Sequence, residues 1–237
     1  DAEIAARMHD ARPTPSVAEN DEGVERVPGT LADTYVARCL ALGASGAEVA
    51  PIRVAYTALH GVGEHVVRRC VAELPFVHLE TVADQAAPDG RFPTVAKPNP
   101  EEPVALTELL ALAESSAAHL ALANDPDADR LAAIVRHAGA LVTLHGDELG
   151  VLLGHHLVCR VAHESAFVVT TIVSSPWLSD VARDLGVRCE TTLTGHKWIH
   201  ARRTELERDG GRFLFGYEEA LGYAFDHGVR DKDGIAA

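Results

Sequence analysis

The chain has 237 residues, of which 47% are hydrophobic and 24% charged, as is typical of one large or two medium globular domains. Its formal net charge of −14 argues against nucleic acids and anionic membranes as partners, and no apolar run approaches the roughly 20 residues of a membrane-spanning helix. The acidic start DAEIAARMHD is no signal peptide, and the four cysteines form no CxxC pair. These features predict a cytoplasmic protein with reduced cysteines.

From about residue 50 the first half alternates between β-rich runs and helical periods. Apolar runs predict strands at 52–57, 76–80, 119–123 and 131–135. Between them, helical spacing is found at 66–74 and 106–116. Strands that alternate with helices imply βαβ units and mainly parallel sheets.

The second half repeats this scheme, with helices expected at 146–162, 177–186 and 196–209 and strands at 166–173, 187–192 and 212–216. The predicted fold class is therefore α/β, with two consecutive α/β domains whose mixed, mainly parallel sheets are flanked by helices. The turn HAGA at 137–140 suggests the seam, which gives a connecting arm at 1–30 and domains at 31–139 and 140–237. Both ends are expected to have been cut from a longer chain.

The stretch ANDPDADRLA, residues 123–132, places three aspartates two residues apart directly after a predicted strand. Pro126 disfavours the helical conformation for Asp125, so the cluster is expected on extended or turning backbone. In an extended stretch, Asp125, Asp127 and Asp129 point to the same side. They are expected to converge at the carboxyl end of the strand, where open α/β sheets bind ligands.

Three converging carboxylates repel one another unless a cation lies between them. All-oxygen ligation favours a hard divalent ion, Mg²⁺ before Ca²⁺ or Mn²⁺. An EF-hand is excluded because Arg130 and Arg136 occupy the positions of its glycine and its last glutamate. Arg130 can grip phosphate oxygens beside the metal, so the loop is suited to stabilising a phosphoryl group in transfer. The alternative is a solvated acidic turn.

The loop NDPDADR resembles the metal-binding loop of the α-D-phosphohexomutase superfamily, the phosphoglucomutases and phosphomannomutases. Five further stretches resemble this family in its usual order: YTALHGVG (56–63), FPTVAKPNPEEP (92–103), TLTGHKWI (192–199), FGYEEALGY (215–223) and RDKDGI (230–235). The resemblance covers most of residues 30–235 and corresponds to the two middle domains of the family. It implies a Mg²⁺-dependent enzyme with Asp125, Asp127 and Asp129 as metal ligands and Arg130 as a catalytic residue.

The resemblance also implies a sugar-binding site in the second domain. Glu218, beside Glu219, would hold hydroxyl groups of the sugar, and Ala220 stands where many members have serine. Thr194, Gly195 and Lys197 belong to a substrate-contacting loop that leads into a helix, and His196 is placed to assist proton transfer as a second catalytic residue. Without the resemblance, the two adjacent glutamates would be interpreted as solvated surface residues. For His196, the alternative is an exposed residue with no role.

The serine that the family phosphorylates, and its closing phosphate-binding domain, have no counterpart in the sequence. The implied reaction moves a phosphoryl group between the 1- and 6-positions of a hexose phosphate through a phosphoserine and a bisphosphorylated sugar. Its partners would be the sugar phosphate and the missing N- and C-terminal domains, and the fragment alone should not turn over.

Other functions stay open at this point. A phosphopentomutase or a sugar bisphosphate synthase could use the same scaffold, and a chain that truly ends here would be a non-catalytic sugar-phosphate-binding module. A haloacid-dehalogenase-like phosphatase is disfavoured, because Asp129 stands where its DxDx[TV] loop needs threonine or valine.

Overall fold

The computed structural model describes residues 2–10, 27–43, 50–160, 164–226 and 228–237. Two units can be separated, residues 1–31 and 32–237, and the first contains helix α1 (Ala2–Asp10). Within the predicted connecting arm, residues 11–26 lie outside the described part of the chain. The α/β fold is contained in the second unit, which α2 (Thr30–Leu42) enters.

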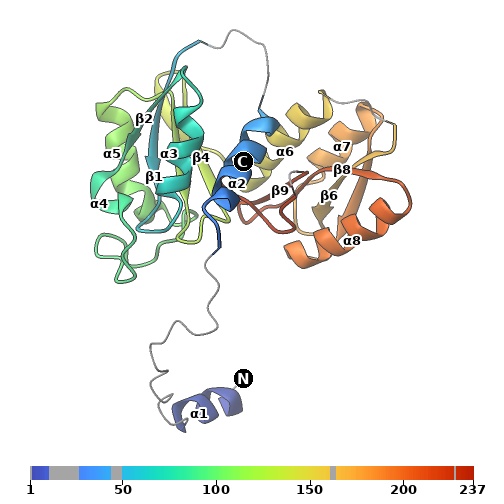
Figure 1. Ribbon diagram of the computed structural model, residues 1–237, viewed down its shortest axis with the longest axis horizontal. Coiled ribbons are helices and arrows are strands. Elements are labelled where there is room, and N and C mark those ends of the chain that lie inside the picture. Colours follow the sequence, from blue (N-terminus) through green and yellow to red (C-terminus); the bar gives the residue numbers. More distant parts are fainter. Residues whose placement is uncertain (1, 11–26, 44–49, 161–163, 227) are drawn as a thin grey trace. The chain divides into compact units, whose positions relative to one another are not determined.

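The first sheet of this unit has five strands in the order β2-β1-β3-β4-β5 (Figure 1). Strands β2, β1 and β3 are parallel, and β4 and β5 are added antiparallel. The strands are β1 (Ile52–Thr57), β2 (Val77–Thr81), β3 (Leu120–Asn124), β4 (Leu131–His137) and β5 (Ala140–Thr143). Its helices are α3 (Glu64–Ala72), α4 (Ala83–Ala86), the 3-10 turn η1 (Pro103–Leu106) and α5 (Thr107–Ser115).

The second sheet has four strands in the order β7-β6-β8-β9, with β9 antiparallel to β8 and the others parallel. Helices α6 and α7 lie on one side of this sheet and α8 on the other (Figure 1). The strands are β6 (Ala166–Thr171), β7 (Arg188–Thr192), β8 (Arg212–Glu218) and β9 (Gly222–Phe225). The helices are α6 (Gly146–Val158), α7 (Trp177–Asp184) and α8 (His196–Arg208).

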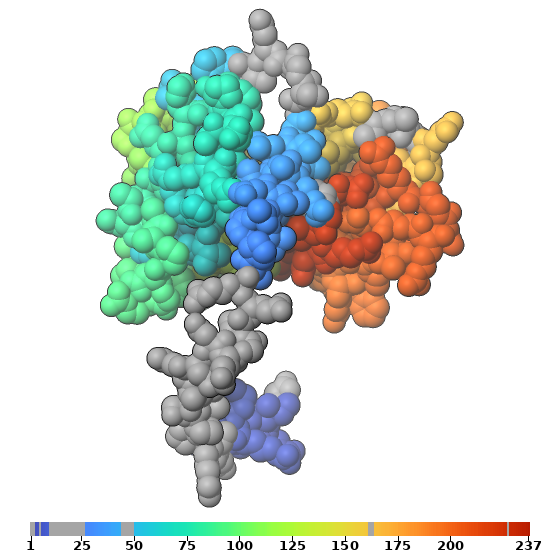
Figure 2. All heavy atoms as spheres, viewed as in Figure 1, coloured from blue at the N-terminus to red at the C-terminus, as the bar shows by residue number. Residues whose placement is uncertain are grey.

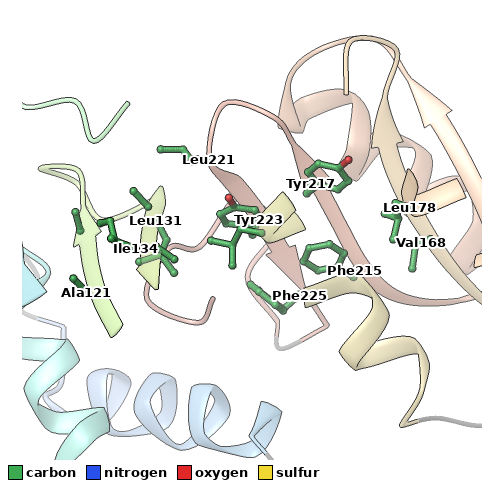
Figure 3. Packing of buried hydrophobic residues seen from close by; sticks show 14 of the residues in the cluster. Ala121, Leu131, Ile134, Val168, Leu178, Phe215, Tyr217, Leu221, Tyr223 and Phe225 are labelled. Carbon is green, nitrogen blue, oxygen red and sulfur yellow. The ribbon is translucent and has the colours of Figure 1, made fainter. Parts of the chain in front are cut away.

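The buried strands explain why the sequence folds in this way. Every residue of β6 is buried, as expected for a parallel strand covered by helices on both faces. One hydrophobic core continues from the first sheet to the second: Ile134 and Leu131 are followed by Tyr223 and Phe225, and these by Phe215 (Figure 3). The two sheets are therefore packed around a shared core.

The predicted fold class, two α/β domains with mixed, mostly parallel sheets and flanking helices, is confirmed. All the strands and helices predicted from residue 50 onward are present, with ends that differ by a few residues. Two short strands, β5 and β9, were not predicted. Within the described residues, no helix is long and apolar enough to cross a membrane.

The domain seam predicted at 137–140 stays a prediction. These residues form the turn of a hairpin, because His137 pairs with Ala140 and β5 continues the first sheet to Thr143. The four residues of β5 are too few to be recognised as a strand without the pairing partner. We propose instead that the boundary lies between β5 and α6.

Candidate functional site

The three aspartates lie in the hairpin loop that joins β3 to β4. One carboxylate oxygen from each of Asp125, Asp127 and Asp129 can be chosen so that all lie within 4.8 Å of one another. The convergence arises from a tight turn and not from the alternation of an extended strand: the Ala128 N–H donates to the Asp125 carbonyl (2.9 Å), and Ala128 has a φ of 60°. The three carboxylates thus converge as expected, but the alternation of side chains along an extended stretch is not the cause.

A buried amide closes this loop at its base. The Asn124 Nδ2 donates to the Arg130 carbonyl (2.7 Å), and its Oδ1 accepts from the Tyr56 hydroxyl (2.9 Å). Asp125 adds a second closure, because its Oδ1 accepts from the Arg130 backbone N–H at 3.0 Å. The two ends of the loop are therefore fixed before any ligand binds.

The glycine-containing turn after β1 packs against the aspartate loop. The Val62 N–H donates to the Pro126 carbonyl (2.8 Å). A Cβ atom on Gly61 would lie 2.3 Å from both the Cα and the carbonyl oxygen of Pro126, closer than real Cβ contacts allow. The glycine at position 61 is needed for this backbone contact with the aspartate loop.

Replacing Gly61 with alanine is expected to displace the aspartate loop and destabilise the protein by about 1–3 kcal/mol, because the clash is with backbone that cannot rotate away. Urea unfolding of the variant measures this. Gly90→Ala is the matched control, since a Cβ at Gly90 meets nothing within 4 Å and should change stability by less than about 0.5 kcal/mol. Equal stability of the two variants would show that the contact with Pro126 is unimportant.

Arg130 is held by acidic and amide groups at the edge of the site. Its Nε donates to Asp125 Oδ2 (2.7 Å) and its Nη1 to Asn99 Oδ1 (3.0 Å), with Glu101 Oε2 at 3.4 Å from Nη1. Partial burial disfavours the charged guanidinium, but the hydrogen bond and charge of Asp125 outweigh it, so the pKa of Arg130 is raised. No acceptor in the described part of the chain is hydrogen-bonded to Nη2, which leaves that nitrogen for a ligand.

Lys232, which was not among the candidate residues predicted from the sequence, lies beside the aspartate loop. Its ammonium lies 3.1 Å from Asp129 Oδ2. Burial disfavours its charge, but the contact with Asp129 and the nearby Glu218 raise its pKa. The RDKDGI stretch was recognised as a family motif, and lysine occurs only at positions 97, 197 and 232. The scarcity of lysine was the signal in the sequence that could have marked Lys232 as a candidate.

The residues present fit a hard divalent cation. Besides the convergence of three carboxylates, Asp129 Oδ1 is buried and accepts no hydrogen bond from the described residues. A buried carboxylate oxygen without a donor is costly unless a cation or water satisfies it. The donor set is entirely oxygen, which suits Mg²⁺.

Backbone hydrogen bonds join the aspartate loop to the loop that carries Glu218. The Leu131 N–H donates to the Leu221 carbonyl (3.1 Å), and Arg130 forms an isolated antiparallel bridge with Gly222. Glu218 is the last residue of β8 and Gly222 is the first residue of β9. The two residues pair with each other, so the loop between them is a short hairpin connection. The candidate metal-binding and sugar-binding residues thus lie on neighbouring backbone.

Glu218 and His196 form a buried polar pair, with exposed fractions of 8% and 6%. His196 Nε2 lies 3.8 Å from Glu218 Oε1, too far for a hydrogen bond. Burial, and next the charge of His200, lower the pKa of His196 to about 4, so the imidazole is neutral at pH 7. Burial raises the pKa of Glu218, an effect that Lys232 opposes. The pair is therefore no ion pair at neutral pH.

The other predicted substrate-binding residues lie apart from this pair. Glu219 turns away from Glu218, since its Oε2 accepts hydrogen bonds from the hydroxyls of Ser174 (3.0 Å) and Thr171 (3.4 Å). Thr194 is exposed, and Gly195 precedes α8 with a φ of 111°, where a side chain would be strained.

Lys197, the remaining predicted substrate-binding residue, is exposed and lies over the ring of Trp198. Its ammonium is 5.6 Å from the centre of that ring. Of the predicted residues in α8 and the preceding turn, only His196 faces Glu218 in this structure.

The buried His196 predicts a pH-dependent stability. Because its folded pKa of about 4 lies below the unfolded value near 6.5, the unfolded state takes up the proton first as the pH falls. The stabilisation is complete above about pH 6.5 and declines toward pH 4. Between pH 7 and pH 5, His196 is expected to remove about 2 kcal/mol from the free energy of unfolding.

Urea unfolding of wild type and His196→Phe at both pH values measures this contribution. The variant should lose less stability than wild type on acidification, whereas the exposed His65→Ala should behave like wild type. A wild-type pH slope in His196→Phe would contradict the lowered pKa.

Comparison with protein families matches both halves of the described fold. Residues 33–139 match the family model described as phosphoglucomutase/phosphomannomutase, alpha/beta/alpha domain II. Residues 145–237 match the corresponding domain III.

Similar individual proteins have names of the same kind. The chain is 41% identical over 209 residues to a probable phosphomannomutase of Haemophilus influenzae, covering 87% of this chain and 41% of that protein. It is 40% identical over 196 residues to human phosphopentomutase, covering 78% of this chain and 32% of that protein. The chain therefore spans less than half the length of these relatives.

Among solved structures, a phosphoglucomutase/phosphomannomutase family protein of Burkholderia thailandensis has a similar fold. The TM-score is 0.71 at 22% identity, over 87% of this chain and 42% of the other. At this identity the likeness supports the fold alone.

Proposed function

Because the chain belongs to the phosphoglucomutase/phosphomannomutase family of the α-D-phosphohexomutase superfamily, with domains II and III represented, we propose that it is the central part of a phosphosugar mutase. The proposed reaction moves a phosphoryl group between the 1- and 6-positions of a hexose phosphate through a phosphoserine and a bisphosphorylated sugar. One observation carries the proposal: the three-aspartate loop is hydrogen-bonded to the loop that carries Glu218. A phosphoryl group and the sugar that receives it can then be held side by side.

Four residues of the first domain are proposed to handle the phosphoryl group. Asp125, Asp127 and Asp129 would hold Mg²⁺, which when bound stabilises the negative charge that develops on a phosphoryl group in transfer. Arg130 Nη2 is proposed to donate to a phosphoryl oxygen, because its Nε and Nη1 are already fixed by Asp125 and Asn99. The phosphoserine itself is proposed to come from another domain of the same protein.

The second domain is proposed to hold the sugar. Glu218 is proposed to accept hydrogen bonds from sugar hydroxyls, and the nearby Lys232 opposes the rise in its pKa that burial causes. The neutral imidazole of His196 has no hydrogen-bond partner in the described residues, so a ring nitrogen is available to accept a proton from a reacting hydroxyl. The remaining predicted residues of this domain are proposed to contribute further substrate contacts: Thr194, Gly195, Lys197 and Glu219.

Phosphopentomutase activity is the second candidate. It is favoured by Ala220, which removes a hydroxyl group that many hexose-specific members supply, and by the 40% identity to human phosphopentomutase. A sugar bisphosphate synthase on the same scaffold is a related alternative, and Ala220 fits it equally. The substrate class is therefore the part of the proposal that needs an assay.

The test is an assay of the protein that contains this chain together with the segments encoded beside it. Mannose 1-phosphate, glucose 1-phosphate and ribose 1-phosphate are supplied with Mg²⁺ and catalytic amounts of the matching bisphosphate. Hexose 6-phosphate formation with little pentose turnover supports the first candidate, and faster ribose 5-phosphate formation supports the second. Binding without turnover of any sugar would contradict both and favour a non-catalytic sugar-phosphate-binding module.

The 237-residue chain alone is proposed to bind Mg²⁺ weakly and to be inactive, because the phosphate that would complete the metal site belongs to the phosphoserine. A cytoplasmic location is proposed as well. The four free thiols at positions 39, 70, 159 and 189 support a reducing compartment.

A further inference from the structure

Helices α2 and α3 lie side by side on one surface of the second unit, next to the C-terminal segment (Figure 2). Asp33 of α2 pairs with Arg69 of α3. A mostly apolar cavity of about 370 Å³ is lined by side chains of both helices, including Cys39 of α2 and Cys70 of α3. Two half-buried thiols thus line one cavity, one from each helix.

Cys39 and Cys70 line the same cavity, and each thiol is the largest influence on the pKa of the other. The interaction raises the pKa of Cys39, where burial acts in the same direction, and it lowers the pKa of Cys70. The neighbouring Arg69 also favours the Cys70 thiolate. Cys70 is therefore the better nucleophile of the pair, because the thiolate is the reactive form.

We propose that Cys39 and Cys70 are a redox-active dithiol that hydroperoxides oxidise to a disulfide joining α2 to α3. The Cys70 thiolate attacks one peroxide oxygen, the O–O bond breaks, and with one proton this gives the Cys70 sulfenic acid and water. The Cys39 thiol then attacks that sulfur, forming the S–S bond and releasing a second water. Two thiols and one hydrogen peroxide thus give one disulfide and two waters.

The position of the pair gives the bond a consequence for the candidate site. Tyr35 lies one helical turn before Cys39 in α2, and its hydroxyl donates to Asp233 Oδ1 at 2.7 Å. Asp233 is adjacent to Lys232, whose ammonium contacts Asp129. A disulfide at Cys39 holds α2 in place one turn from the contact that anchors the Lys232 segment.

The other two cysteines are in different surroundings and serve as controls. Cys159 is exposed, with its sulfur 3.5 Å from His155 Nε2. Cys189 is half-buried, its sulfur lies 3.3 Å from the Ser179 hydroxyl, and burial raises its pKa. Neither of them interacts with another thiol in the described residues.

The experiment exposes the chain to hydrogen peroxide, blocks the remaining thiols with iodoacetamide, and maps each cysteine by peptide mass spectrometry. In wild type and in Cys189→Ser, Cys39 and Cys70 are expected to lose alkylation together, to appear in one disulfide-linked peptide pair, and to recover with dithiothreitol. The oxidised protein should also have a higher Tm than the reduced protein, because the bond restricts the unfolded chain.

Cys39→Ser and Cys70→Ser should each abolish the linked peptide pair and the rise in Tm, and circular dichroism checks that both variants are folded. The proposal is overturned if Cys39 and Cys70 stay fully alkylated at peroxide concentrations that oxidise the exposed Cys159. It is also overturned if either cysteine is found linked to Cys159 or Cys189 instead.

Discussion

Replacing Asp127 with alanine is expected to abolish phosphoryl transfer while leaving the fold intact. Asp127 is the exposed member of the three converging carboxylates. No hydrogen bond within the described chain depends on it, so the free energy of unfolding should change by less than about 0.5 kcal/mol. Under the proposed function, loss of one ligand would remove much of the metal's stabilisation of the transferring group, which corresponds to at least about 3 kcal/mol or a 100-fold fall in turnover.

Two measurements separate this effect from unfolding. Calorimetric titration of the chain with Mg²⁺, and with Mn²⁺ as a second probe, should show weaker binding in Asp127→Ala. Turnover of the longer protein should fall in parallel and recover in part at high metal concentration. Asp184→Ala is the matched control, because its side chain is 76% exposed and remote from the loop. Retained turnover in Asp127→Ala would contradict the proposed metal site.

Replacing Lys232 with methionine is expected to change metal affinity and turnover in opposite directions. The ammonium lies 3.1 Å from Asp129 Oδ2, so it competes with a cation for that carboxylate. Without it, the chain should bind Mg²⁺ roughly tenfold more tightly, about 1.4 kcal/mol for a partly screened charge pair. Turnover of the longer protein should fall about 100-fold, because a positive charge beside the phosphoryl group is lost.

The opposite signs distinguish this role from a structural one. Lys97→Met is the control, since Lys97 is 77% exposed and only contacts Glu102 at 3.6 Å. A parallel loss of Mg²⁺ affinity and turnover in Lys232→Met would mean that the lysine merely supports the loop. Unchanged turnover would exclude it from the catalytic machinery.

Much of the fold was predictable because local patterns agree with it. The strand Ala166–Thr171 is a continuous apolar run, buried along its whole length, and it needs no knowledge of its neighbours to be recognised. The four-residue strands β5 and β9 were missed because so short a segment becomes a strand only through its pairing with β4 or β8.

The candidate site was predictable to the extent that its residues are close in the sequence. Asp125, Asp127 and Asp129 share one loop, so any turn there brings them near one another. Lys232 approaches the same loop from more than a hundred residues away, and no local pattern indicates that contact. Glu218 and Glu219 are neighbours in the sequence, yet only Glu218 faces His196, because hydroxyls of Thr171 and Ser174 hold Glu219 on the other side.

The sequence by itself determined the α/β class, the order of most elements and the family, because periodicity and short motifs are encoded within a few residues of each other. The tertiary structure alone decided which of the motif residues share one site and in which protonation state. It buries His196 beside Glu218, lowers the pKa of the imidazole, and sets Lys232 against Asp129. Burial and the placement of charges depend on chain segments that meet only when the protein folds, and these set the chemistry that the site can perform.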